Sequence, residues 1–455
     1  MKIIDSVAAV FCNGHKIFTV RRQSYLKAFP GYDSFPGGKI DREDSRAQHP
    51  VRFLCNWDGH AMHALVREVQ EELDYDLPAE IASGQIVSVK YLATALAPAT
   101  VAIRFRLHFF RIDLKTRPVF SVDPGEIADS CWKTPMQLLD SFHKGDALMV
   151  PPLYWLLEKL HRDPQGDNFG DLSPRFDESI YVPRIEVLSG VQMLPIPSNT
   201  FPPEKRTNAF LLGDKGSPQI LVDPSPASPQ VLEKLRYTLR RDTIDSLFIT
   251  HHHPDHYEHA PELARHLSIP IKMSEDTRCR ITQQQGNDYF SDLQIEVMQE
   301  GTRLTDWKGE AVRVYSIPGH DAGHLGLAPE SLRWFLVGDL IQSTGTVVIA
   351  VPEGDMAVYF QTLKQIITLD PAVIIPSHGM PSRSTYRLQE TLNHRQNREK
   401  EILELFLNGK TPAEILDIIY PEINQHLRPF ARLNIESHLT KLRQDGQLMT
   451  VTKQH

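Results

Sequence analysis

The pattern of apolar and polar positions predicts strands at the start of the chain. Two apolar segments, Ile3–Cys12 and Lys16–Val20, are separated by Asn13-Gly14, a dipeptide that favours a tight hairpin turn. Apolar residues at helical spacing follow over Ala61–Leu73, and long strand-like runs fill residues 85–114. The first part of the chain therefore predicts a domain of mixed strands and helices.

A change in composition marks the end of that domain. Pro151-Pro152 precede Leu153–Leu160, an apolar helical stretch that closes the domain. From residue 162 to about 183 the chain is rich in Asp, Pro, Gly and Asn and lacks apolar periodicity, which is typical of a linker. We therefore predict a first domain over 1–165 and a linker over 166–183.

The pattern of apolar and polar positions changes after the predicted linker. Helical stretches such as Pro229–Arg240 alternate with short β-rich runs, which is typical of a layered α/β domain. These runs are Gln219–Val222, Ser246–Ile249, Val312–Ile317, Arg333–Val337 and Ala372–Ile375. From Gln396 the pattern indicates three helices, with Thr411-Pro412 opening the second, and a short hairpin around Gly446. We predict an α/β domain over 184–395 and a winged-helix domain over 396–455.

Composition and charge exclude several classes of protein. The chain has 455 residues, of which 41% are hydrophobic and 23% charged, so it is a multidomain globular protein rather than a fibrous one. Its net charge of -8 argues against a surface built to hold a polyanion. No apolar run reaches the ~20 residues of a bilayer-spanning helix, so we expect no membrane partner. The four cysteines form no CxxC pair, which favours a reducing cytoplasm.

Side chains of metal-binding types gather in one short segment. Residues 250–256, with the sequence THHHPDH, directly follow a predicted strand and place four such side chains on one loop: His251, His253, Asp255 and His256. Three further candidates each follow an apolar strand: His320, Asp339 and His378. Imidazole and carboxylate donors in this arrangement suit Zn²⁺ or a neighbouring first-row metal.

A single histidine is more often a surface or packed residue than a ligand. We give that interpretation to four further histidines: His252, His259, His266 and His394. Seven candidates that recur at strand ends are hard to produce by chance. The sequence therefore predicts one metal-binding site built from all seven.

The motifs HxHxDH, PGH, GD and SHG resemble those of the metallo-β-lactamase superfamily of hydrolases, over about residues 185–381. The resemblance implies an αββα sandwich that holds two Zn²⁺ or other first-row divalent metals. One metal would be held by His251, His253 and His320. The other would be held by Asp255, His256 and His378, and Asp339 would bridge the two.

The same resemblance assigns roles around the metals. Two cations about 3.5–4 Å apart lower the pKa of a shared water toward ~7 and stabilise charge on a carbonyl or phosphoryl oxygen. Asp255 would also be catalytic by orienting the nucleophile, and Asp223 would support the ligands from behind. His324 is expected to face the substrate or to support a ligand. Tyr257-Glu258-His259 stand where many relatives have Gly-Gly, which leaves the substrate open.

The C-terminal part resembles a lactamase-like subfamily that carries a winged helix. The resemblance rests on Gly338–Gly345, Tyr359–Leu369, Asn393-His394-Arg395 and the terminal helices. Members include single-strand endoribonucleases and acyl-carrier thioesterases, so the substrate stays open. Basic residues of the terminal helices are matched in number by acidic ones, and we favour a lid or packing role over nucleic-acid recognition.

A cluster of carboxylates lies near the N-terminus. In the sequence REVQEE, at residues 67–72, Glu68, Glu71 and Glu72 fall on one face of a predicted helix. Clustered carboxylates suit Mg²⁺ or Mn²⁺, which in turn suit a diphosphate substrate. A solvated helix face would explain this hexapeptide by itself. The upstream turn Phe35-Pro36-Gly37-Gly38 can bring backbone close to a metal or phosphate, which favours a site.

Gly-Gly followed by RExxEE resembles the Nudix box of diphosphate hydrolases, over about residues 1–160, and the resemblance implies an α/β/α domain. Two features depart from the common box: an insertion after Asp44, which stands where a Glu is usual, and Asp74 where Gly usually ends the helix. An inserted box occurs in the Nudix branch that cleaves coenzyme A and its acyl esters. The resemblance implies the following site: Glu68, Glu71 and Glu72 bind Mg²⁺ or Mn²⁺, Arg67 braces the helix, and Arg22, Gly37 and Gly38 contribute to cofactor binding.

Together these resemblances imply a bifunctional metal-dependent hydrolase. The larger half would hydrolyse an ester, thioester or phosphodiester, and the Nudix-like half a diphosphate. Small-molecule substrates would be an acyl-CoA, a nucleotide diphosphate derivative or a thioester. Two alternatives stay open: a single-strand endoribonuclease or phosphodiesterase acting on single-stranded RNA, and a Nudix-like half that senses nucleotides without catalysis.

Overall fold

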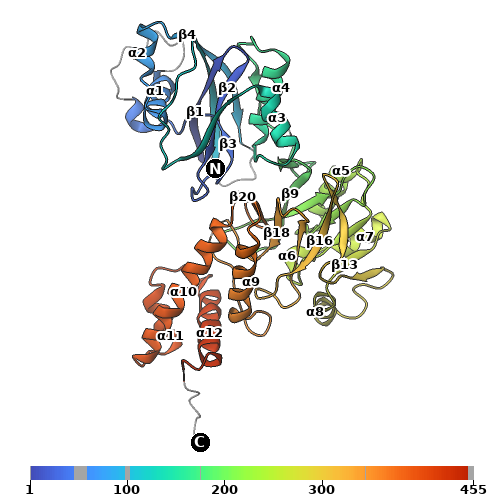
Figure 1. Cartoon of the computed structure of the whole chain (residues 1–455). Coiled ribbons are helices and arrows are strands. Elements are labelled where there is room, and N and C mark those ends of the chain that lie inside the picture. The colour runs from blue at the N-terminus through green and yellow to red at the C-terminus, as the bar shows by residue number, and fades with distance from the viewer. Residues whose placement is uncertain (1, 46–58, 98–102, 175, 344, 449–455) are drawn as a thin grey trace, which may run out of the picture. The chain divides into compact units, whose positions relative to one another are not determined.

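The computed structural model describes residues 2–45, 59–97, 103–174, 176–343 and 345–448. The chain divides into two compact units, and each is described by itself (Figure 1). The first unit comprises Met1–Glu178 and Ile185–Gln192, and the second comprises Ser179–Arg184 and Met193–His455. Within the described ranges, no helix is both long enough and apolar enough to cross a lipid bilayer.

A mixed seven-stranded sheet is the frame of the first unit. Its strands follow the order β3-β2-β1-β5-β4-β7, with β6 paired to β2. The predicted hairpin is confirmed, because Asn13 pairs with Lys16 across a turn in which Gly14 takes a φ of 60°. The strands are β1 (Lys2–Asn13), β2 (Lys16–Arg22), β3 (Asp33–Ser34), β4 (Ile86–Leu96), β5 (Ile103–Leu114), β6 (Ile127–Lys133) and β7 (Gly170–Asp171).

Helices cover both faces of this sheet. The helices α1 (Gly59–Leu73) and α2 (Leu77–Ala82) lie on one face, and α3 (Pro135–His143) and α4 (Pro151–Arg162) lie on the other (Figure 1). Side chains along β1 alternate between the two cores, since Phe11 packs with α1 and Val10 packs with α4. The predicted α/β/α architecture is confirmed.

The range 166–183, predicted as a linker, contains ordered structure. Gly170 of β7 pairs with Ala93 of β4, and Leu172 is buried in the core of the first unit. Val182 is buried in a core of the second unit. Leu172 and Val182 are thus buried in different cores, and single apolar residues of this kind leave no periodicity in the sequence.

Two sheets form the inner layers of the second unit. The first follows the order β14-β13-β12-β11-β10-β9-β8 and the second the order β15-β16-β17-β18-β19-β20. The strands of the first sheet that belong to the second unit are β9 (Val191–Pro197, from Met193 on), β10 (Arg206–Leu212), β11 (Ile220–Val222), β12 (Ser246–Phe248), β13 (Ile271–Met273) and β14 (Ile295–Val297), while β8 (Ile185–Leu188) belongs to the residues of the first unit. Those of the second are β15 (Arg303–Trp307), β16 (Glu310–Ser316), β17 (Leu325–Pro329), β18 (Phe335–Gly338), β19 (Val373–Pro376) and β20 (Ser382–Arg383).

Helices form the outer layers of this unit, so the predicted αββα sandwich is confirmed. On the first sheet pack α5 (Pro229–Leu239), α7 (Ala260–Leu267) and α8 (Glu275–Gln285), while the short α6 (Pro254–Tyr257) follows β12. On the second sheet pack α9 (Met356–Leu369) and the start of α10 (Tyr386–Leu407).

The strand order brings the polar segments after four strands together. In the first sheet β11 runs parallel to β12, and in the second β18 runs parallel to β19. Asp223 and the 250–256 segment follow the first pair, and Asp339 and His378 follow the second pair. Parallel neighbours end at the same edge of a sheet, so residues that follow them meet there.

The C-terminal helices are α10, α11 (Pro412–Ile419) and α12 (Arg428–Gln444). The domain boundary predicted between residues 395 and 396 falls inside α10, where the helix runs without a break. Thr411 opens α11 with a reciprocal capping box to Glu414, as the Thr-Pro pair predicts. The sequence predicts a short hairpin around Gly446, but α12 runs to Gln444 and Gly446 lies in the turn that follows it; residues beyond Leu448 lie outside the described range.

The core between α9 and the second sheet yields a test of this fold. Leu363 of α9 is fully buried there, whereas the adjacent Lys364 is exposed. We expect Leu363→Ala to lower the free energy of unfolding by about 2–5 kcal/mol, because it removes buried contacts and leaves a cavity. Lys364→Ala should change it by less than about 0.5 kcal/mol. Urea denaturation followed by circular dichroism measures both, and equal effects would contradict this packing.

Candidate metal centre and carboxylate site

The structure brings all seven predicted metal ligands of the second unit together in two groups. One group contains His251, His253, His320 and Asp339, and the other contains Asp255, His256, His378 and Asp339. Within each group the candidate ligand atoms all lie within 4.8 Å of one another. Because Asp339 belongs to both groups, they form one continuous centre.

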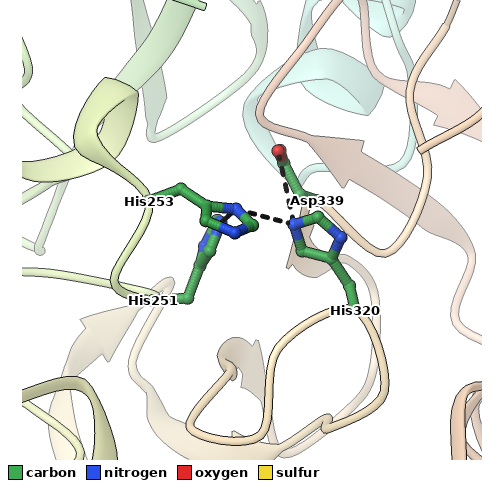
Figure 2. A group of neighbouring side chains, drawn as sticks. All are labelled: His251, His253, His320 and Asp339. Atoms are coloured by element: carbon green, nitrogen blue, oxygen red, sulfur yellow. Dashed lines mark hydrogen bonds and ion pairs between the residues drawn. The ribbon is translucent and has the colours of Figure 1, made fainter. Parts of the chain in front are cut away.

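Three imidazoles of the first group converge on one point, as Figure 2 shows. His253 Nδ1 lies 2.9 Å from His251 Nε2 and 3.0 Å from His320 Nε2. Burial lowers the pKa of His251 well below its usual value and that of His320 to about 4, so both rings are neutral. Neutral rings that direct lone pairs at one point are poised to share a cation there.

Asp339 faces the imidazoles of both groups. Its Oδ2 lies 3.3 Å from His256 Nε2 and 3.9 Å from His320 Nε2, and its Oδ1 lies 3.3 Å from His378 Nε2. Burial acts to raise the pKa of Asp339, but His378 and His256 hold it well below its usual value. Asp339 is therefore an ionised carboxylate in a site that water barely reaches.

Asp255 completes the second group. Its Oδ2 lies 3.4 Å from His378 Nε2. Burial acts to raise its pKa, yet the neighbouring imidazoles, that of His256 first, lower it to about 2. Asp255 is therefore ionised at neutral pH.

Asp223 holds the histidine loop from behind, in the supporting place expected for it. Its carboxylate accepts hydrogen bonds from Thr250 N (2.8 Å) and Thr250 Oγ1 (2.8 Å) and pairs with His256 Nδ1 (2.9 Å). Asp223 takes a φ of 46°, a left-handed conformation that Asp tolerates better than most residues. It is fully buried, so these contacts fix both the loop and the direction of one candidate ligand.

Backbone carbonyls orient two other rings. His320 Nδ1 donates to Val348 O at 2.9 Å, and His378 Nδ1 donates to Arg206 O at 3.0 Å. A carbonyl only accepts, so in each ring Nδ1 carries a proton and Nε2 faces the centre. His320 Nε2 has a free lone pair there. Burial acts to lower the pKa of His378, but Asp339 raises it to about 10, so a cation at this position would take the place of the proton on its Nε2.

The burial of two histidines decides between alternatives that the sequence leaves open. His324 is fully buried and packs on Gly338, where a Cβ atom would lie 2.2 Å from its Nε2, so it does not face a substrate. His252, interpreted as an ordinary histidine, is buried beside the centre and forms an ion pair with Asp321.

Sequence reasoning missed Asp321 and Glu353. Carboxylate oxygens of Glu353 lie 3.5 Å from His252 Nε2 and 3.5 Å from His253 Nε2. Asp321 directly follows His320, but the sequence does not indicate that either acid pairs with a histidine, and only the tertiary structure reveals these pairs.

Several predicted residues of the first unit also meet. Gly37 N donates to Glu72 Oε2 at 2.9 Å. A Cβ at Gly38 would lie 2.3 Å from Glu68 Oε2, so glycine at this position leaves room for the Glu68 carboxylate beside the turn. Burial raises the pKa of Glu72 to about 8, with added repulsion from Glu68 and from Glu126, an acid that the sequence did not single out. Such a carboxyl needs a cation nearby to stay ionised at neutral pH.

Arg67 forms ion pairs with several acids of this cluster. Its Nη1 donates to Glu68 Oε1 at 2.8 Å and to Glu71 Oε2 at 3.0 Å. Its Nε and Nη2 each donate to the buried Asp44, at 3.1 Å. Asp44 thus serves where a Glu is usual, and Asp74 takes the left-handed φ of 49° that a glycine usually provides.

Glu71 and Arg22 are less closely engaged. The side chain of Glu71 is 60% exposed and bonds to Arg67. In the ranges that the structure covers, Glu68, Glu71 and Glu72 do not form one tight cluster of ligand atoms like that of the histidines. Arg22 is near enough to lower the pKa of Glu72, and its Nε donates to Ala28 O at 3.2 Å.

The position of Asp223 yields a second test. We expect Asp223→Ala to lower the affinity for one of two zinc ions by about 10–100-fold, because His256 loses the partner that orients it. Titration of the metal-free protein with zinc against a chromophoric chelator measures this affinity.

Asp370→Ala is the matched control. Asp370 shares the left-handed conformation, with a φ of 49°, but is exposed at the end of α9. Equal zinc affinity in the Asp223 variant and this control would contradict the supporting role.

Family models match three parts of the chain. The metallo-beta-lactamase superfamily model matches residues 202–378, and the beta-lactamase associated winged helix domain matches 411–452. The NUDIX domain model matches 2–155. The matched ranges contain the histidine centre, the terminal helices and the carboxylate site respectively.

Individual relatives agree with these matches. The beta-lactamase-like protein 2 homolog of Drosophila melanogaster is 30% identical over 257 residues, which are 53% of this chain and 84% of that protein. An atrochrysone carboxyl ACP thioesterase of Paecilomyces divaricatus is 24% identical over 263 residues, which are 53% of this chain and 76% of that protein. A solved beta-lactamase domain protein from Burkholderia ambifaria shares the fold, with a TM-score of 0.51 and 22% identity over 60% of this chain and 91% of that one.

Proposed function

This chain belongs to the metallo-β-lactamase superfamily and carries a Nudix domain, and from this premise we propose that it is a bifunctional hydrolase of acyl-CoA-type substrates. The larger unit would cleave a thioester, and the Nudix domain would cleave a diphosphate. That the chain is a hydrolase follows from its two domains. The substrates, the ions and the residue roles below are the proposal.

The observation that carries the proposal is the place of Asp339 between two groups of imidazoles. His256 Nε2 and Asp339 Oδ1 are buried, and beyond the ion-pair contacts at 3.3 Å described above neither atom makes a hydrogen bond with the residues described. Buried polar atoms of this kind need a partner, and a divalent cation in each group would supply one. The donor set, imidazole nitrogen with carboxylate oxygen, fits Zn²⁺. His251, His253 and His320 would hold one ion, Asp255, His256 and His378 the other, with Asp339 facing both.

The chemistry divides between the metals and the chain. A bound pair of divalent cations would supply water of lowered pKa and would polarise the acyl carbonyl. Asp255 stays ionised and its side chain is 14% exposed, so it can accept a hydrogen bond from an attacking water and orient it. His253 is 26% exposed and lies on the open side of the centre.

A thioester is the substrate class that the relatives favour. The acyl-carrier thioesterase is 24% identical to this chain over more than half of it. The inserted Nudix box resembles that of enzymes acting on coenzyme A, so both halves would act on one class of molecule. The terminal helices bear mixed charge, and nothing in them favours RNA over such a substrate.

In the Nudix domain, Glu68 and Glu72 would hold Mg²⁺ or Mn²⁺ near the backbone of Gly37 and Gly38. Glu71 could join them by releasing Arg67, since its side chain is largely exposed. The cation would neutralise the diphosphate and keep the buried Glu72 ionised.

The thioesterase activity is tested with a panel of acyl-CoAs, acyl-carrier thioesters and single-stranded RNA. We expect thioester cleavage that chelation abolishes and zinc restores. His253→Ala should abolish it, because one metal group loses a central ligand. Thiol release measured with a chromogenic reagent reports the reaction.

His426→Ala provides the matched control, because His426 is exposed and lies outside both metal groups. It should leave thioester cleavage unchanged. RNA cleavage without thioester cleavage would overturn the substrate assignment.

A substitution at Glu72 tests the proposed diphosphatase activity separately from the thioesterase activity. Glu72→Gln keeps a hydrogen-bond acceptor for Gly37 N but removes the charge. We expect it to slow Mg²⁺-dependent cleavage of coenzyme A by at least ~100-fold, measured by chromatography of the products, while thioester cleavage persists.

Asp140→Asn, an exposed change on α3 of the same unit, should leave both activities intact. Nucleotide binding without turnover in the unaltered chain would instead indicate a sensor.

A further inference from the structure

Three consecutive residues after β18, Val347, Val348 and Ile349, are each tied to a different element of the second unit. Val347 O accepts a hydrogen bond from Arg395 Nη2 of α10. Val348 O accepts from His320 Nδ1 at 2.9 Å. Ile349 N donates to Asn434 Oδ1 of α12 at 2.9 Å. The carbonyl that orients His320 is therefore flanked by two anchors from the C-terminal helices.

These contacts are sheltered from water. Arg395 is 3% exposed, Asn434 7% and His320 5%. The side chains of Val347 and Ile349 are also buried, in the core that contains Leu388 and Leu392 of α10. A buried backbone group that loses its partner is costly, so each anchor restrains the peptide it holds. With both neighbours held, the Val348 carbonyl has one available direction.

Arg395 is an unusual anchor. Burial lowers the pKa of its guanidinium, which lies 6.0 Å from the ring centre of Tyr359. Tyr359 in turn donates to Leu340 O at 2.7 Å, directly after Asp339. A charged donor to a carbonyl makes a stronger hydrogen bond than a neutral donor does. The helix that carries Arg395 is thereby connected to the surroundings of two candidate ligands, His320 and Asp339.

We infer that the C-terminal helices are a structural part of the metal centre, in which Arg395 and Asn434 are positioning residues. They fix the Val348 carbonyl, and this carbonyl fixes the tautomer and direction of His320. The inference rests on the proposed function, since it takes His320 to be a metal ligand. Through Asn434 of α12, it gives the winged-helix region a role in metal affinity rather than in recognition of nucleic acid.

Asn434→Ala in the full-length protein tests the inference, because it removes the acceptor for Ile349 N without adding bulk. We expect one of two zinc ions to bind about 10–100-fold more weakly, measured against a chromophoric chelator. Asn434→Asp keeps an acceptor in place and should restore most of the affinity. Visible absorption bands of the Co²⁺-loaded protein should change in Asn434→Ala, since they report ligand geometry.

Ser437→Ala is the matched control. Ser437 lies one turn further along α12, is 2% exposed, and its Oγ has no hydrogen-bond partner among the residues described. Its loss should leave zinc affinity and the Co²⁺ bands unchanged. If Asn434→Ala loses the circular dichroism of the folded protein, Arg395→Met tests the same peptide from the other side, and weakened zinc binding is again expected.

The outcomes separate the two hypotheses. Fewer than two zinc ions bound by the unaltered protein would contradict the proposed function. Two zinc ions in the unaltered protein, with Asn434→Ala and Arg395→Met both binding zinc like Ser437→Ala, would overturn the positioning role alone.

Discussion

The second unit depends on one electrostatic constraint, the burial of an ionised carboxylate, Asp339, among imidazoles from separate segments. A buried charge is tolerated only when its surroundings compensate for the lost water. Here His256, His320 and His378 face the two oxygens of Asp339. The remaining candidate ligands lie around this carboxylate, and the loop after β12 and the carbonyls behind the rings hold the arrangement.

The two sites of the chain are organised differently. In the histidine centre most candidate ligands are buried and each of several rings has a fixed partner behind it, such as Asp223 for His256. In the Nudix domain Arg67 holds the acids by direct ion pairs, and Glu71 remains mostly exposed. Imidazole ligands need orientation because only one nitrogen points at the metal, whereas a carboxylate offers two oxygens. The denser support around the histidines follows from this difference.

The terminal helices connect to the centre through backbone rather than through ligands. Neither α10 nor α12 supplies a candidate ligand, yet both hold the peptide that holds His320. In this chain the terminal helices thus contact the loop that orients His320, which a separate recognition domain would not do. The continuous α10, which crosses the predicted domain boundary, fits this integration because a rigid helix transmits position along its length.

The sequence by itself determined the elements and the candidate ligands, because apolar periodicity and motifs at strand ends are local signals. The hairpin at Asn13-Gly14, the strands before His251 and Asp339, and the carboxylates around Arg67 could all be predicted in this way. Only the tertiary structure decided which partners lie behind the ligands. It shows that His252 pairs with Asp321, that Val348 O accepts from His320, and that β7, next to Leu172, pairs with β4. Each of these contacts joins residues that are far apart in the chain. Apolar periodicity shows which face of a helix or strand is buried, but it does not show which other element that face contacts. The contacts between elements therefore could not be predicted from the sequence.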